Sequence, residues 1–387
     1  MRRGAVVLAL LAGGAPLPLP VLAPRPLGAQ RFWKHTLYPY FYYSTVDGVW
    51  GGGHFGLHSP LGYVERPEPH LAAVALDASA STQGSYAVAA DVQAPAWWEG
   101  WRVGLTFAAA RANRLGYYGL GNDSRYDKSS VTASNPYFYR VSRTTRSARL
   151  TVQRRVAGPL RLLAGASIEH VDFRELPGGS QFRFDHASGA VDSSTVPFDD
   201  AALRAGVILD SRDHEVDPHR GAFLEALVAS GKGYRRTTVA ARAYVRPAER
   251  LVLAARLAGE RMSGDPPVAT QMVMESSERP FIAVGGYRSL RGYYDARFVG
   301  PGKLLGGLEA RYALVWAPSI LEVKVVGFYD AGRVFAPGEE VTITSDGLHA
   351  SGGAELAARI QRNALIVLGA GFGAEGGQIL FGTTWSY

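Results

Sequence analysis

Apolar and charged residues alternate along most of this chain, and this period of two constrains the fold more than any other feature. Within residues 251–260, Arg256 and Glu260 share one face, whereas Leu253 and Leu257 share the other. Residues 203–213 and 322–330 repeat the pattern. Side chains of a β-strand point alternately to opposite sides, so the pattern predicts strands with one apolar and one charged face.

The chain contains about 16 such segments, the first near residues 36–46 and the last near 377–387. Their connections alternate, roughly, between tight turns and long loops. The long loops are expected at residues 113–136, 172–200 and 263–302. An even number of strands, with short turns at one end and long loops at the other, is typical of bacterial transmembrane barrels.

Alternation alone also fits a soluble β-sandwich, which would bury its apolar faces and expose its charged ones. The mean hydropathy of −0.03 is too polar for a helical membrane protein of 387 residues, but it suits a barrel between lipid and a wet lumen. Aromatic residues also gather near strand ends, as Phe328 and Tyr329 do. We therefore expect an all-β, transmembrane antiparallel barrel with a long loop folded into its lumen.

The N-terminus has the layout of a signal peptide. Two arginines precede the apolar run 5–11, and Gly28 and Ala29 supply small residues at a cleavage site. Prolines between these features would interrupt a membrane-spanning helix. We expect residues 1–29 to be removed and residues 30–387 to form the barrel. Removal of residues 1–29 lowers the formal net charge from +7 to +4. A net charge of +4 is too small to indicate nucleic acid as a partner.

Nothing in the sequence indicates an enzyme, a cofactor or a metal. The chain has no cysteine, which excludes disulfides and thiolate metal sites. Its nine histidines show no metal-binding spacing, and no Gly-x-Ser-x-Gly elbow is present. The acids at positions 210, 213, 215 and 217 lack the spacing of a calcium loop, so a charged turn is the simpler interpretation.

The chain ends in an aromatic residue within the segment 379–387. A strand there would place Phe381, Trp385 and Tyr387 on one face. This ending resembles the C-terminal β-signal by which outer-membrane proteins are recognised for insertion. The alternative is an ordinary edge strand that happens to end the chain.

A motif in the longest loop carries a family resemblance. It reads Leu290, Arg291, Gly292 and Tyr293. It resembles the Val-Arg-Gly-Phe/Tyr loop motif of the BamA/TamA-type outer-membrane insertase and translocase superfamily, also called the bacterial surface antigen family. Eleven expected strands precede the motif and five follow it, which is the arrangement of that family.

A second motif agrees with the resemblance. Its residues are Asp210, Arg212, Asp213, Pro218 and Gly221, and they look like the family's strand-and-turn motif. Residues 117–124 are similar to a loop of its shorter members. The resemblance covers about residues 36–387.

The resemblance also implies partners for the loop arginine. In the family, acidic residues of the two following strands hold it, and here these positions are Glu309 and Asp330. A guanidinium can fork toward two carboxylates, and a buried charge needs such compensation. Gly292 would let the loop backbone approach the barrel wall. The alternative is an exposed Arg291 without a partner.

The resemblance leaves two functions open at the bacterial outer membrane. As an insertase or translocase, the barrel would template client strands at a weak seam between its first and last strands, where Gly371, Gly373, Gly376 and Gly377 could loosen the packing. Its partners would be outer-membrane lipid, unfolded outer-membrane or exported proteins, and a separate periplasmic protein, because only about six residues separate the cleavage site from the first strand. Alternatively, the barrel is a passive pore or a structural protein.

Overall fold

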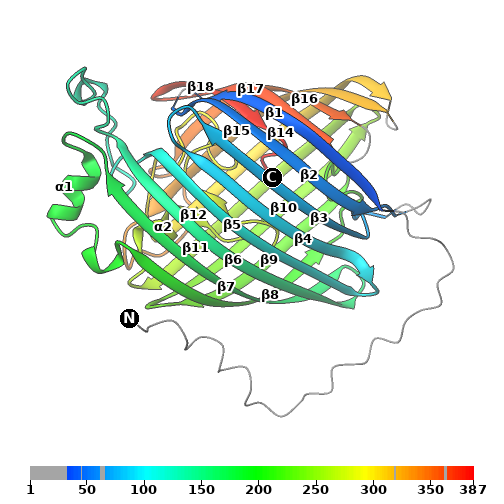
Figure 1. Ribbon diagram of the computed structural model, residues 1–387. Helices are drawn as coiled ribbons and strands as arrows, with labels where there is room; N and C mark the ends of the chain where they lie inside the picture. Colours follow the sequence, from blue (N-terminus) through cyan, green and yellow to red (C-terminus); the bar gives the residue numbers. More distant parts are fainter. Residues whose placement is uncertain (1–32, 45, 62–65, 318–319, 361–363) are drawn as a thin grey trace, which may run out of the picture. The chain divides into compact units, whose positions relative to one another are not determined.

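A computed structural model describes residues 33–387 of the protein, except 45, 62–65, 318–319 and 361–363. The expected signal peptide, residues 1–29, lies outside the described residues. Trp33–Tyr387 form one compact unit. It is a single strongly curled β-sheet whose long connections gather at one end (Figure 1).

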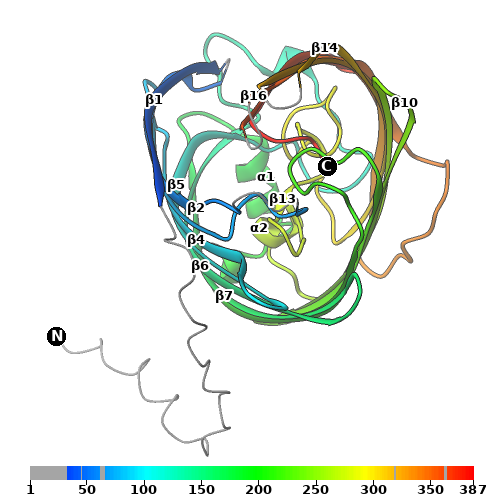
Figure 2. The ribbon, with the colours of Figure 1, turned by 90° about the vertical axis from the view of Figure 1, so that its right-hand side faces the viewer.

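Within the described residues the sheet has 16 strands, each antiparallel to the next strand of the sheet along the chain. They are β1 (Lys34–Ser44), β2 (Gly48–Ser59), β3 (Ala72–Ser81), β4 (Tyr86–Trp98), β5 (Trp101–Gly116), β6 (Arg140–Ala157), β7 (Leu160–Glu175), β8 (Phe198–Asp210), β9 (Gly221–Gly231), β10 (Tyr234–Ala248), β11 (Leu251–Gly264), β14 (Gly302–Ala317), β15 (Leu321–Phe335), β16 (His349–Ile360), β17 (Ala364–Gly373) and β18 (Gly376–Gly382). Figure 2 shows the sheet curling around a lumen. The expected antiparallel barrel fold is confirmed.

Short elements lie in the connections between these strands. They are η1 (Lys128–Ser130), α1 (Gln181–Ala187), η2 (Ser193–Thr195), α2 (Val268–Gln271), and the hairpin of β12 (Val273–Met274) and β13 (Phe281–Ile282). Ser180 begins α1, since its side chain accepts a hydrogen bond from the backbone N–H of Arg183 at 3.1 Å. Among the described residues, no helix is both long and apolar enough to cross a membrane.

The wall of the barrel is apolar outside and charged inside. On β11, Leu253 and Leu257 are 41% and 43% exposed, whereas Arg256 and Glu260 are 7% and 1% exposed. A soluble sandwich would show the reverse, because water would favour the charged face. The exposed leucines therefore belong to a lipid-facing surface, and the alternation arises from lipid on one side of each strand and the lumen on the other.

The long loop after β11 runs through the lumen. Residues 265–301, which contain α2, β12 and β13, lie inside the curled sheet in Figure 2. This placement confirms the expected lumen loop. The loops after β5 and β7 begin later than expected, because those strands continue to Gly116 and Glu175.

The end of the chain differs from the sequence expectation. β18 stops at Gly382, and residues 383–387 turn into the lumen, where the C-terminus lies in Figure 2. Phe381 is 51% exposed on the outer face, whereas Trp385 and Tyr387 are each 5% exposed. The three aromatic residues therefore do not share one face of a strand. Trp and Tyr each carry a polar group that a lumen can satisfy and lipid cannot.

Candidate functional site

Arg291 lies at the centre of a buried charge cluster inside the barrel. Its Nε and Nη2 donate to the two carboxylate oxygens of Asp330 at 2.7 and 2.9 Å, and its Nη1 donates to Glu309 at 2.7 Å. The side chains of all three residues are 0% exposed. The structure thus brings the loop arginine to both acids on the two strands that follow the loop.

Three more side chains complete the cluster. Glu355 of β16 accepts from Nη1 of Arg291 at 3.3 Å, and the guanidinium carbon of Arg291 lies 3.7 Å from the ring centroid of Phe328. Arg311 donates to the second oxygen of Glu309 at 2.8 Å. Burial by itself would lower the pKa of Arg291, but the surrounding carboxylates raise it well above its ordinary value. Arg291 is therefore a permanent cation that holds three acids of the wall together.

Glycine is required where the loop meets the wall. A Cβ on Gly292 would lie 2.5 Å from the carbonyl carbon of Phe372 and 2.6 Å from the amide nitrogen of Gly373. A Cβ on Gly371 would lie 2.6 Å from the carbonyl oxygen of Arg291, and one on Gly373 would meet the ring of Tyr293 at the same distance. These glycines of β17 therefore make room for the loop motif, a packing role that was not expected for them.

The flanking residues of the motif pack into an apolar cluster. Leu290 is 0% exposed and Tyr293 is 3% exposed, and both belong to a cluster with Phe298, Leu305 and Val334. This cluster joins the loop to β14 and β15. The loop is therefore held by apolar packing on both sides of the charged contact.

The strand-and-turn motif after β8 also binds the lumen loop. Arg212 donates from Nε and Nη2 to the carboxylate of Asp210 at 2.9 and 3.0 Å, and from Nη2 to Glu278 of the loop at 2.8 Å. Glu278 also accepts from Arg242 of β10 at 2.7 Å. Two wall arginines thus hold one loop carboxylate, and their charges keep the pKa of Glu278 well below its usual range although burial opposes this.

The rest of that motif shapes the turn. One carboxylate oxygen of Asp213 accepts from the backbone N–H groups of His214, His219 and Arg220 at 2.9, 2.9 and 3.2 Å. Gly221 has φ +100°, and a Cβ there would lie 2.2 Å from the carbonyl oxygen of Ser211. Pro218 is buried within the same turn. These residues are structural.

One cluster has the donor set of a metal site but already contains a cation. Asp217, His219 and Glu322 bring one ligand atom each within 4.8 Å of the others. The ammonium of Lys324 lies 2.6 Å from Asp217 and 3.1 Å from Glu322. The lysine therefore compensates these carboxylates in the place where an ion would sit.

The C-terminal tail packs against this inner face. The indole N–H of Trp385 donates to Asp217 at 3.1 Å, and the hydroxyl of Ser386 donates to Glu309 at 2.8 Å. The guanidinium of Arg311 lies 3.9 Å from the ring centroid of Trp385. Because Glu309 also binds Arg291, the tail and the loop motif share one carboxylate.

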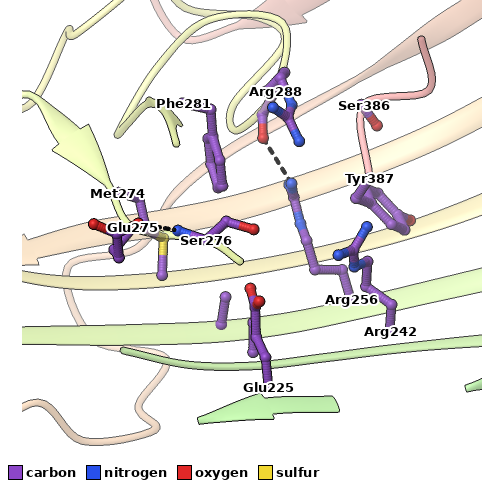
Figure 3. Close-up of a pocket in the computed structure, with 12 residues that line it drawn as sticks. Glu225, Arg242, Arg256, Met274, Glu275, Ser276, Phe281, Arg288, Ser386 and Tyr387 are labelled. Atoms are coloured by element: carbon purple, nitrogen blue, oxygen red, sulfur yellow. Dashed lines mark hydrogen bonds between the residues drawn. The ribbon is translucent and has the colours of Figure 1, made fainter. Parts of the chain in front are cut away.

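A small cavity remains between loop, tail and wall. Figure 3 shows Arg256 and Tyr387 facing it, with Nη1 of Arg256 donating to the carbonyl oxygen of Arg288 at 2.7 Å. Its volume is about 20 Å³, room for about one water molecule. The loop and the tail therefore pack closely against β9, β10 and β11.

The two edges of the sheet meet without a hydrogen-bonded ladder. Among the described residues, strand pairings run from β1 to β18 and none joins these two strands. Tyr42 of β1 stacks on its register partner Trp50, which is buried, so Tyr42 points into the lumen. Phe381 of β18 pairs with the exposed Leu368, so Phe381 points outward. Yet the rings of Tyr42 and Phe381 stack with centroids 6.0 Å apart. Edge-to-edge pairing would put these rings on opposite faces, so β18 overlaps the inner side of β1.

Comparison with known proteins assigns the family. The profile of the Omp85 superfamily domain matches residues 72–373. The chain belongs to the Omp85 superfamily. The expected family resemblance is therefore confirmed, and the protein is an outer-membrane barrel. No curated protein matches the chain.

Solved structures agree with an Omp85 fold. BamA from Haemophilus ducreyi lacking POTRA domains 1–3 matches with a TM-score of 0.55 at 14% identity, over 90% of this chain and 68% of that one. CdiB from Escherichia coli matches with a TM-score of 0.55 at 11% identity, over 90% of this chain and 60% of that one. The chain thus spans about two thirds of that shortened BamA and three fifths of the CdiB chain.

Sequence reasoning missed part of this Omp85 lumen site. Glu355 shares the lumen face of β16 with Arg359, and the same alternation that identified Glu309 and Asp330 would have found it. Nothing in the sequence indicated that Trp385 and Ser386 lie in the lumen, because the alternation of residues 379–387 predicted a strand of the barrel wall there.

Proposed function

We propose that this barrel assists the insertion or export of proteins at the outer membrane, without catalysing a chemical reaction, and that the seam between β1 and β18 is its working part. The observation that carries the proposal is the stacking of Tyr42 on Phe381 across edges that share no ladder. Clients would be unfolded outer-membrane or exported proteins arriving from the periplasm.

The physical basis is the cost of an open strand edge in lipid. Each unsatisfied backbone group costs several kcal/mol in the hydrocarbon region. An incoming strand that pairs with β1 would satisfy these groups by β-augmentation. The apolar Leu37 and Phe41, 75% and 76% exposed on β1, give such a strand a lipid-facing surface to align with.

A covalent link between β1 and β18 tests this proposal. Because the chain has no cysteine, only the introduced cysteines can react with the crosslinker. A Tyr42→Cys, Phe381→Cys pair joined by a short bis-maleimide would hold β1 to β18. The reconstituted protein should accelerate the folding of a test barrel into vesicles, and the link should abolish that acceleration. The matched control joins Leu368→Cys to Phe381→Cys, which are already partners in the β17–β18 ladder.

The control link should leave the acceleration unchanged. Equal loss in both linked proteins would contradict a role for the seam. If the unlinked protein gives no acceleration but a steady conductance, the passive pore is the correct function. The lumen loop and the C-terminal tail occupy space that a conducting pore would need, which favours insertion over conduction.

A further inference from the structure

Two arginines face outward where the wall meets the long loops. Arg261 of β11 is the register partner of Thr237, and Arg235 lies two residues before Thr237 on β10. Val239, the next outward residue of β10, is 55% exposed. Both arginines are exposed, and they lie immediately above the apolar outer surface.

Neither guanidinium contacts a partner among the residues that the structure describes. Within the part of the chain that the structure describes, neither Arg235 nor Arg261 forms a side-chain hydrogen bond, an ion pair or a ring contact. The neighbouring lumen arginine differs, since Arg236 donates to Glu260 at 2.7 Å. A cation at the edge of the hydrocarbon region is stable when its head reaches anionic groups. Both guanidinium groups are therefore free to bind an anionic group from outside the chain.

A cavity opens beside Arg261 at the same rim. Its volume is about 390 Å³, the size of a small-molecule site. Buried Met262 and Val268 line it, together with the polar side chains of Ser263, Asp265 and Gln271. Hydroxyl groups of a ligand can donate to Asp265 and bond to Ser263 and Gln271.

We propose that this rim binds the headgroup of a phosphorylated glycolipid of the outer leaflet. The phosphate lies at Arg235 and Arg261, because the planar guanidinium matches phosphate oxygens in pairs. The sugar hydroxyls enter the cavity, and the acyl chains run down the wall along residues such as Val239 and Leu257. The site lies at the end where long loops gather, which is the extracellular end in barrels of this kind. It does not depend on the proposed function of the seam.

Binding to a defined lipid tests the site. The full chain in detergent micelles is titrated with diphosphorylated lipid A and with its dephosphorylated form, and bound lipid is counted by native mass spectrometry. We expect binding to the diphosphorylated form only. Arg235→Gln and Arg261→Gln should each weaken binding of the lipid about fivefold. One arginine near an anionic lipid surface contributes about 1 kcal/mol to binding, which corresponds to about fivefold in affinity.

Two controls separate this site from general attraction of charge. Arg250→Gln removes an exposed arginine from the opposite end of the same strand pair, and it should leave binding unchanged. Heat-dependent gel mobility confirms that each variant is folded. Equal losses in Arg250→Gln and Arg261→Gln, or equal binding of the dephosphorylated lipid, would overturn the proposal. Equal binding of anionic vesicles of phosphatidylglycerol would likewise show attraction of charge alone.

Discussion

Arg291 and Asp330 form a two-pronged ion pair inside the barrel, with Nε and Nη2 of the arginine 2.7 and 2.9 Å from the two carboxylate oxygens. The pair joins a loop to a wall strand 39 residues later in the chain. Because neither side chain is exposed, water can replace neither partner. The pair therefore links the position of the lumen loop to the shape of the wall.

Removal of this arginine should destabilise the barrel. Arg291→Ala leaves the buried Asp330 and Glu355 without this cation and Glu309 with Arg311 alone, and we expect a loss of about 3–5 kcal/mol in the free energy of unfolding. Urea unfolding in micelles measures it. Arg279→Ala is the control in the same loop, because its ion pair with Asp91 is 65% exposed on the arginine side and should contribute less than about 1 kcal/mol. Similar losses in both variants would contradict the assignment.

A methyl group at Gly292 should push the loop off the wall. The added Cβ would lie 2.5–2.6 Å from the backbone of β17, and backbone cannot yield as a flexible side chain can. We expect Gly292→Ala to cost about 1–3 kcal/mol and to expose the loop to protease. Gly327→Ala on β15, where a Cβ meets nothing within 4 Å, should change neither property.

Loss of Trp385 should release the tail from the lumen. Trp385→Ala removes the bond to Asp217 and the stacking on Arg311, a loss of about 3 kcal/mol. A Ser386→Cys reporter, 2% exposed when the tail is seated, should then react with maleimide on the order of a hundredfold faster. Ile343→Cys, 79% exposed, should react equally in both backgrounds. An unchanged rate at Ser386→Cys would show that the tail is not held as described.

Acid should weaken the barrel through His70, in the connection between β2 and β3. Burial, together with the nearby His58 and Arg102, lowers the pKa of His70 from 6.5 to about 4, although Glu215 opposes the shift. Between pH 4 and 6.5 the unfolded chain therefore binds more protons at His70 than the folded chain does. The stability that the folded barrel has with a neutral His70 is present above pH 6.5 and is lost as the pH falls toward 4.

The test compares urea midpoints at neutral pH and near pH 4. His70→Gln should reduce the difference between the two, because glutamine does not titrate. His35→Gln, on the exposed edge strand β1, should retain it. The same acid sensitivity in His70→Gln as in the native chain would exclude this histidine as the cause.

Much of the architecture was readable from residue order. The alternation of Leu253 and Leu257 with Arg256 and Glu260 identified both faces of β11, because lipid and lumen each select for one kind of side chain. The motif around Arg291 indicated which loop enters the lumen. The acids at 309 and 330 followed from the family resemblance together with their parity on the next two strands.

Only the tertiary structure decided where the C-terminal tail lies and how the two edge strands meet. The last nine residues alternate as a strand should, but Trp385 and Tyr387 gain hydrogen bonds and cationic neighbours by turning inward. The contact of Tyr42 with Phe381 joins residues from opposite ends of the sequence, and it depends on how far the whole sheet curls. Alternation along a strand is a local property that neighbouring residues determine, whereas the meeting of two edges sums the twist of all 16 strands.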